Sequence, residues 1–245
     1  MKSSRITPPE TRFDLAAFHR LIPSRFSDSG TVLEDLADSD KMLRDLVLLD
    51  GATNDRILGE QQGLIGISTY ELVYGIPNAH IVNAAFTHAS ETGARFNDHT
   101  RGAWYAADEL ETSLAEVTYH KSRRLMEMVV PELPYRRPDK ESSTYDDWLA
   151  DFRGTFHELK PAAKFSDCLK PEPVPQCYHS SQLLARTLLE MKSNGLVYPS
   201  VRRERSRCLV CFRPALVYHP RRAKRLEIRF KAAATGYEHR VRPVR

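Results

Sequence analysis

The segment RFNDHTRGAWYAADELETSLAEVTYH, residues 95–120, places three kinds of chemically useful side chain on three consecutive elements. Arg95 stands before an Asn-Asp turn, Tyr105 follows in a run of small and aromatic residues, and Glu116 belongs to the helix predicted next. A hydrophobic core alone does not require that order. A site for an anionic ligand with an aromatic part does, because guanidinium groups bind anions and aromatic rings stack on flat ligands.

The helix predicted after residue 109 explains how Glu116 could border a site. Three apolar residues at helical spacing form a stripe that faces the core: Leu110, Leu114 and Val117. Glu116 lies beside this stripe together with Ser113 and His120, because residues three and four apart share a helix face. We therefore expect Glu116 at the edge of the buried face.

Hydrophobic patterning predicts the elements around this segment. Strands are expected over residues 79–88, 103–107, 196–201, 208–218 and 225–230. One or two amphipathic helices, broken near residues 38–40, are expected over residues 32–49. Further amphipathic helices are expected from residue 109 onward and over 180–192. The basic tip RRERSR should join the strands on either side of it into a hairpin.

Composition indicates a globular protein, with 41% hydrophobic and 28% charged residues among 245. Four cysteines are too few for a disulfide framework in a chain of this length, so a reduced cytosolic protein is expected. The opening MKSSRITPPETRF lacks the apolar core of a secretory signal, and no apolar run is long enough to cross a bilayer. We expect a cytoplasmic protein without membrane contact.

Charge is distributed unevenly along the chain. Residues 202–245 carry 14 Lys and Arg against 3 Asp and Glu, whereas the preceding residues carry 22 against 29. A basic end on an acidic body indicates an anionic partner, an acidic protein, or a contact within the chain. The basic region lacks interleaved aromatic residues and a recognised nucleic-acid motif, so direct nucleic-acid binding is the weaker interpretation.

Cys208 and Cys211 form a Cys-x-x-Cys pattern, which often indicates zinc or redox chemistry. Here both cysteines fall within a predicted strand, where residues i and i+3 point to opposite faces. The spacing to Cys168 and Cys177 matches no zinc pattern. We expect buried small hydrophobic residues and no metal site.

Seven short motifs occur in an order that resembles the RES-domain family: FHRLIPSRF, TNDR, AAFTH, GARFN, GAWYAA, TSLAEVTYH and GLVYPSVR. The resemblance runs from about Phe18 to Pro214. It implies an α+β fold of the ADP-ribosyltransferase type, in which two small packed sheets are surrounded by helices. One such domain would span residues 1–245, with a helical amino-terminal extension over about 1–75. A Pro- and charge-rich insertion over about 131–177 would form a surface excursion with a short helix near 145–152.

Many members of the family are toxins of two-component toxin–antitoxin pairs. They deplete NAD⁺ by phosphorolysis or hydrolysis of the nicotinamide–ribose bond, and some members instead ADP-ribosylate a protein. The resemblance therefore implies an enzyme for which NAD⁺ is a substrate and not a cofactor. It also implies a helix-turn-helix antitoxin that covers the active site. The oligomeric state is open, a homodimer included.

Carried over to the matching motifs, the functional positions of the family fall on Arg20, Arg95, Tyr105, Glu116 and either Ser181 or Ser200. Arg20 and Arg95 would hold the pyrophosphate, for which a guanidinium is the matching donor. Tyr105 would stack on the nicotinamide, and Glu116 would stabilise the positive charge that develops on the ribose. GARFN carries alanine where many members have a second glycine, and FHRL lacks the tyrosine that some members place after the arginine.

Two other functions use the same sequence differently. A protein ADP-ribosyltransferase would use the same site residues. A nucleic-acid-binding toxin would instead use the basic carboxy-terminal region. A redox use of NAD in a Rossmann domain is not supported, because no Gly-x-Gly-x-x-Gly follows a strand.

Overall fold

The computed structural model describes residues 6–27, 66–128, 138–161 and 163–244. Its strands are β1 (Glu10–Pro23), β2 (Trp104–Ala107), β3 (Lys140–Glu158), β4 (Gly195–Pro199), β5 (Arg207–Cys211), β6 (Tyr218–Ala233) and β7 (Gly236–Pro243). Its α-helices are α4 (Ala79–Thr87), α5 (Leu110–Glu127) and α6 (His179–Glu190). Short 3₁₀ helices are η1 (Ser24–Phe26), η2 (Thr69–Glu71), η3 (Ala163–Leu169), η4 (Gln176–Tyr178) and η5 (Pro214–Leu216).

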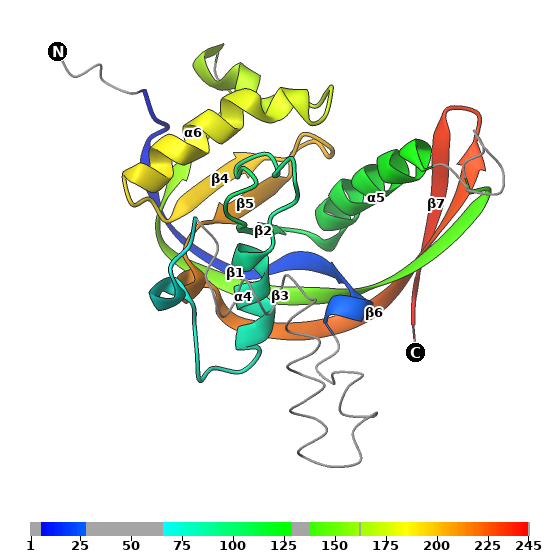
Figure 1. Cartoon of the computed structure of the whole chain (residues 1–245), viewed down its shortest axis with the longest axis horizontal. Helices are drawn as coiled ribbons and strands as arrows, with labels where there is room; N and C mark the ends of the chain where they lie inside the picture. The colour runs from blue at the N-terminus through cyan, green and yellow to red at the C-terminus, as the bar shows by residue number, and fades with distance from the viewer. Residues whose placement is uncertain (1–5, 28–65, 129–137, 162, 245) are drawn as a thin grey trace.

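All seven strands belong to one mixed sheet in the order β1-β2-β5-β4-β3-β6-β7, and an additional β1–β3 pairing closes the first five into a ring. β1 meets β2 at the pair His19–Ala107, and β3 meets β4 in parallel at His157–Leu196. β6 and β7 extend the sheet beyond β3, beside α5 (Figure 1). The predicted α+β class is confirmed, but two separate small sheets are not formed, because hydrogen bonds connect every strand.

The main core lies inside this ring. Phe18 of β1, together with Trp148 and Phe152 of β3, packs in one cluster with Trp104 of β2 and Leu209 of β5. Burial of such aromatic side chains is the largest favourable contribution that a core makes to stability. The ring therefore holds β1 and β2 rigidly against each other, and these are the strands that carry Arg20 and Tyr105.

A second cluster lies on the other face of β4 and β5, under α6. Cys208 belongs to this second cluster and Cys211 to the main core, so the two cysteines point to opposite faces as predicted. Both are buried. Among the described residues, no group of three or more His, Cys, Asp or Glu side chains is arranged to hold a metal ion.

Several predicted elements are confirmed. Residues 103–107 contain β2, residues 180–192 contain most of α6, and residues 225–230 lie within β6. β4 and β5 pair antiparallel across the basic tip, as predicted for the hairpin. The apolar stripe of α5 packs against β-strand residues as expected, with Leu110, Leu114 and Val117 in one cluster.

The strand predicted over residues 79–88 is wrong, because Ala79–Thr87 form α4. Its most buried apolar residues are Ile81, Val82, Ala85 and Phe86, and their spacing follows a helix instead of alternating. The β-branched and aromatic residues suggested a strand. The alanines between them favour the helix, and packing against the ring determines the outcome.

Two further predictions are corrected by the long strands. Residues 10–23 form β1 and not part of a helical extension, and residues 140–158 form β3 and not a surface excursion with a short helix. The charged residues of β3 suggested a segment at the surface, but Asp146 and Asp147 are only 0% and 1% exposed. Arg225 and His19 satisfy these two carboxylates inside the fold. The helix predicted over 32–49 lies outside the described residues.

The basic carboxy-terminal part contacts the acidic body through ion pairs. The pairs formed by arginines are Arg202–Glu172, Arg203–Glu109, Arg207–Asp108, Arg213–Glu71, Arg221–Asp151, Arg222–Asp146 and Arg225–Asp146. Asp146 is fully buried, whereas most other members are at least partly exposed. The contact within the chain, one of the three interpretations of the uneven charge, is thus confirmed.

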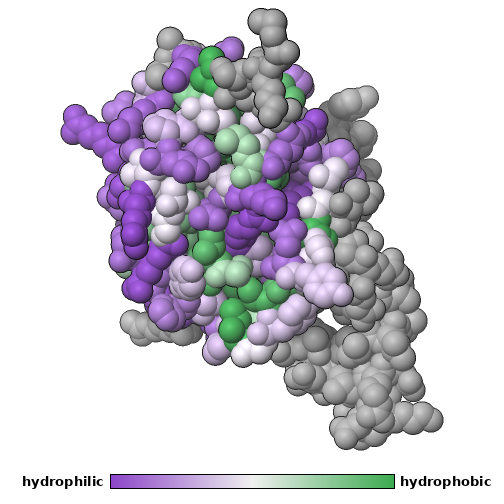
Figure 2. Space-filling view, turned by 90° about the vertical axis from the view of Figure 1, so that its left-hand side faces the viewer, coloured by the Kyte–Doolittle hydropathy of each residue, from purple (hydrophilic) through white to green (hydrophobic). Residues whose placement is uncertain are grey.

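The face of the molecule shown in Figure 2 is mostly hydrophilic, with hydrophobic residues in its lower half and a few more near the top. Among the described residues, the most exposed large hydrophobic side chain is Tyr70 at 98%, followed by Tyr74 at 66%. Isolated residues of this kind are common on protein surfaces.

In the described part of the chain, no helix combines the length and the hydropathy that a bilayer-crossing segment requires.

Gly195, at the start of β4, should tolerate no side chain. Its φ is +140°, and a Cβ there would lie 2.0 Å from the Val210 carbonyl oxygen of the neighbouring strand. Gly236 has nearly the same φ, +143°, but open space around it. We predict that Gly195→Ala lowers the free energy of unfolding by about 3 kcal/mol or more, whereas Gly236→Ala costs only backbone strain of about 1–3 kcal/mol. Equal losses in urea denaturation would contradict the steric argument.

Candidate active site

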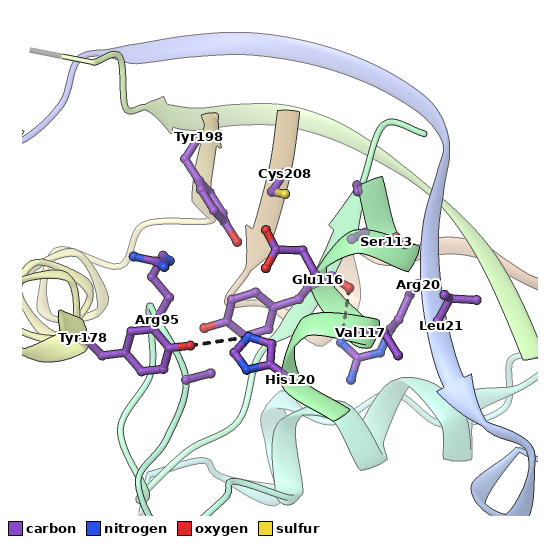
Figure 3. A pocket seen from close by; sticks show the side chains of 14 residues that line it. Arg20, Leu21, Arg95, Ser113, Glu116, Val117, His120, Tyr178, Tyr198 and Cys208 are labelled. Atoms are coloured by element: carbon purple, nitrogen blue, oxygen red, sulfur yellow. Dashed lines mark hydrogen bonds between the residues drawn. The ribbon is translucent and has the colours of Figure 1, made fainter. Parts of the chain in front are cut away.

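A cavity of about 280 Å³ opens between β1, β2, α5 and the loop before β2. It is lined by Arg20, Leu21, Ala94, Arg95, Tyr105, Ala106, Ala107, Ser113, Glu116, Val117, His120, Tyr178, Tyr198 and Cys208. Figure 3 shows Arg95 and Tyr178 on one side, Arg20 on the other, and Glu116 and His120 on α5 between them. Four of the six predicted site residues therefore meet in one cavity, although 96 positions separate the first from the last of them in the chain.

Arg20 extends from β1 into the cavity over the ring of Trp104, with 4.9 Å between its Cζ atom and the ring centroid. Its Nη1 donates to the Tyr105 carbonyl oxygen at 3.3 Å, while its buried Nε has no hydrogen-bond partner. Burial lowers the pKa of Arg20 to about 10, so the side chain still carries its positive charge at neutral pH. Among the described residues no carboxylate pairs with this guanidinium, and a buried cation in that state favours an anionic ligand.

Arg95 is 7% exposed and is also held without a carboxylate. Its Nη1 donates to the carbonyl oxygens of Cys168 and Lys170 at 3.1 and 2.9 Å. Its Cζ lies 5.1 Å from the centroid of the Tyr178 ring. Carbonyl groups and an aromatic face orient the guanidinium while leaving its charge uncompensated. No described carboxylate forms an ion pair with it.

The turn that presents Arg95 is fixed from both sides. The Tyr105 hydroxyl donates to Asn97 Oδ1 at 2.8 Å and accepts from the Phe96 amide at 2.9 Å. From α6, Gln182 Nε2 donates to three carbonyl oxygens of the same turn, including that of Asn97 at 3.1 Å. Burial raises the pKa of Tyr105, so its phenol remains a donor at neutral pH. Tyr105 thus lines the cavity with its ring and anchors the loop with its hydroxyl.

Glu116 extends from α5 into the middle of the cavity. Burial raises its pKa above the ordinary value, while a hydrogen bond from Ser200 and the charges of Arg202 and Arg95 act in the opposite direction. The Ser200 hydroxyl donates to Glu116 Oε1 at 3.0 Å. The same hydroxyl oxygen accepts the backbone amides of Arg202 and Arg203 at 3.1 and 3.2 Å. The end of β4 therefore determines which oxygen of Glu116 stays available to a ligand.

The two serine candidates lie in different surroundings. Ser200 contacts Glu116 directly, although it does not line the cavity wall. Ser181 is 0% exposed inside α6, and its hydroxyl donates to the Tyr178 carbonyl oxygen at 2.9 Å. It is not among the residues that line the cavity. Of the two, Ser200 is the one that the fold connects to the acidic side chain.

Several cavity residues were not predicted as site residues from the sequence, among them Tyr178, Tyr198 and Cys208. Tyr178 comes at the end of the Pro-rich stretch, where no periodic pattern marks a residue as buried. Burial raises its pKa to about 12. His120, noted in the sequence only as a neighbour of Glu116 on the helix, contacts Tyr178 with its Nε2 atom 3.5 Å from the hydroxyl oxygen.

A second, outer cavity of about 560 Å³ adjoins the first. The two share Leu21, Ala94, Glu116, Val117, His120 and Tyr178. Beyond them the outer cavity is bordered by Lys121, Arg123 and Arg124 of α5. Together the two cavities offer the space that a ligand of several hundred Å³ requires.

The sequence matches a known protein family. A family model described as RES domain matches residues 72–231. No curated protein matches the sequence. The crystal structure of the M. tuberculosis MbcT–MbcA toxin–antitoxin complex contains a similar chain, with 13% identical residues and a TM-score of 0.38. That match covers 55% of this chain and 71% of the other.

Removal of the Ser200 hydroxyl should raise the pKa of Glu116 further, because the hydrogen bond that it donates favours the ionised carboxylate. We predict a higher Glu116 pKa in Ser200→Ala, measured by NMR titration of the side-chain carboxyl and assigned with Glu116→Gln. Ser113→Ala is the matched control, since Ser113 lies on the same helix as Glu116 but its hydroxyl donates to the His19 carbonyl oxygen at 2.7 Å. An unchanged or lower pKa in Ser200→Ala would show that the hydrogen bond is absent in solution.

Proposed function

The chain belongs to the RES-domain family, and we propose that it is a toxin that depletes NAD⁺ by cleaving the nicotinamide–ribose bond. The observation that carries the proposal is the pair of guanidinium groups, half-buried Arg20 and buried Arg95, that face one cavity without a described carboxylate partner. A pyrophosphate is an anion whose geometry such groups match. Glu116 stands between them in the same cavity, where a ribose joined to that pyrophosphate would lie.

The cleavage step needs stabilisation of positive charge. When the bond between C1′ and nicotinamide breaks, nicotinamide leaves as a neutral molecule and the ribose becomes cationic. An ionised Glu116, held by Ser200, would stabilise this cation more than the ground state. Tyr105 would offer its ring to the flat nicotinamide. The size of the dinucleotide requires the outer cavity as well as the inner one.

Two further parts of the proposal concern the nucleophile and the partner. Hydrolysis would give ADP-ribose, and phosphorolysis would give its 1″-phosphate. The resemblance to the family supports a helix-turn-helix antitoxin that covers the cavity mouth. The basic carboxy-terminal region supports no separate nucleic-acid function, since nine of its arginines pair with carboxylates of the chain itself.

The first experiment incubates the purified protein with NAD⁺, with and without inorganic phosphate, and identifies products by mass spectrometry. We predict release of nicotinamide, and a loss of about 10²- to 10³-fold in turnover for Glu116→Gln, which keeps the shape but removes the charge. Glu111→Gln is the matched control on the same helix, because Glu111 is exposed and does not line the cavity. Near-normal turnover by folded Glu116→Gln would refute its catalytic role.

Arg20→Ala should weaken NAD⁺ binding by roughly 1.5–3 kcal/mol, the value of a charge-assisted contact. Calorimetry in the Glu116→Gln background avoids consumption of the ligand. Arg20→Lys should restore only part of the affinity, because an ammonium lacks the planar fork of a guanidinium. Arg153→Ala, at a side chain that is 63% exposed on β3, should leave the affinity unchanged. Equal affinities for Arg20→Ala and the unmodified protein would mean that the phosphates bind elsewhere.

A further inference from the structure

His120 is placed where the two cavities meet. It lines both of them, one helical turn after Glu116 on the same face of α5. Figure 3 shows its ring beside Tyr178, with Glu116 on the same helix. Glu116 also lines both cavities, so a small molecule that enters from the outer cavity toward the ribose would meet the imidazole and the carboxylate together.

Apart from Glu116, the polar groups that line the inner cavity are poorly suited to accept a proton. The guanidinium groups of Arg20 and Arg95 have no acceptor atom. Burial raises the pKa of the Tyr178 phenol to about 12, and burial also raises the pKa of Cys208, so both remain protonated at neutral pH. Glu116 accepts the Ser200 hydroxyl and, in the proposed function, the ribose.

The surroundings of His120 keep its imidazole neutral. Loss of water around the ring is the largest effect, followed by the positive charges of Arg202, Arg95, Arg123 and Arg124, and together they lower its pKa to about 4. Glu116 is the carboxylate on the same helix face, and Tyr178 contributes the hydroxyl 3.5 Å from Nε2. A neutral imidazole has one nitrogen with a free electron pair, which can receive a proton.

We infer that His120 is the general base that accepts the proton of an incoming water molecule during cleavage of the nicotinamide–ribose bond. This inference rests on the proposed function. The bond from C1′ to nicotinamide breaks, and its electron pair leaves with nicotinamide. The water oxygen forms the new bond to C1′, and the proton that this water loses moves to a ring nitrogen of His120. The products are nicotinamide, ADP-ribose and a protonated imidazole that later releases its proton to solvent.

The test compares a nucleophile that must lose a proton with one that need not. Azide is an anion at neutral pH and forms ADP-ribosyl azide without proton removal. In His120→Gln, hydrolysis of NAD⁺ should fall by about 10²-fold or more, the usual contribution of a general base, while azidolysis should stay within a few-fold of the unmodified protein. His239→Gln, an exposed histidine on β7, is the matched control and should change neither reaction.

Each outcome decides the inference. Equal losses in both reactions would assign His120 a structural or binding role through Tyr178, and unchanged hydrolysis would exclude a base role. In His120→Ala, added imidazole should restore hydrolysis, and failure of this rescue would also overturn the inference. A wild-type protein that gives only the phosphorolysis product would overturn it while leaving the proposed function intact. Absence of nicotinamide release from the wild type would refute the proposed function itself.

Discussion

Burial of positive charge without a described counter-ion is the constraint on which the site depends. Taking a guanidinium out of water costs several kcal/mol unless other groups replace its hydration. For Arg20 the replacement is the Trp104 ring and the Tyr105 carbonyl, and for Arg95 it is two carbonyls and the Tyr178 ring. These groups come from segments that only the closed ring of strands brings together. The fold thus surrounds both arginines with carbonyl groups and aromatic rings, which carry only partial charges. A carboxylate would have neutralised the arginines, whereas these groups leave both cations able to attract an anion.

Glu116 is the corresponding negative charge of the cavity. It is the carboxylate of the inner cavity, and it is held by a serine hydroxyl in place of an arginine. Arg202 acts on it through its field and through the backbone amide that orients Ser200, while its own guanidinium is committed to the Pro171 carbonyl, Glu172 and the Tyr119 ring. The cavity therefore keeps separated charges of both signs. Separated charges of this kind lower the free energy of unfolding, and they are retained where a bound ligand provides the missing opposite charge.

The sequence predicted the local elements around the site better than it predicted the sheet. The helix that carries Glu116 was identifiable, because its apolar stripe at Leu110, Leu114 and Val117 has helical spacing and packs as that spacing requires. β3 was not identifiable, because Asp146 and Asp147 look like surface residues until Arg225 and His19, distant in the chain, are placed beside them. α4 was mistaken for a strand because packing against the ring outweighs the preference of its β-branched residues. Arg20 and Ser200 could be placed only by resemblance to a family, since no periodic pattern connects them to Glu116.

The uneven distribution of charge along the chain is explained by the ion pairs of the fold. Taken alone, an excess of basic residues after position 201 suggested an external anionic partner as readily as an internal one. In the fold, Arg207, Arg213 and Arg225 return to acidic residues of the preceding segments, which neutralises much of this excess locally. Arg20 and Arg95 belong to the segment with a net negative charge, yet both line one cavity and neither forms an ion pair with a described carboxylate. Net charge along a sequence therefore gave no indication of where the anion site lies. The positions of these two cations in the fold do indicate the anion site, because both arginines line the cavity that Glu116 also lines.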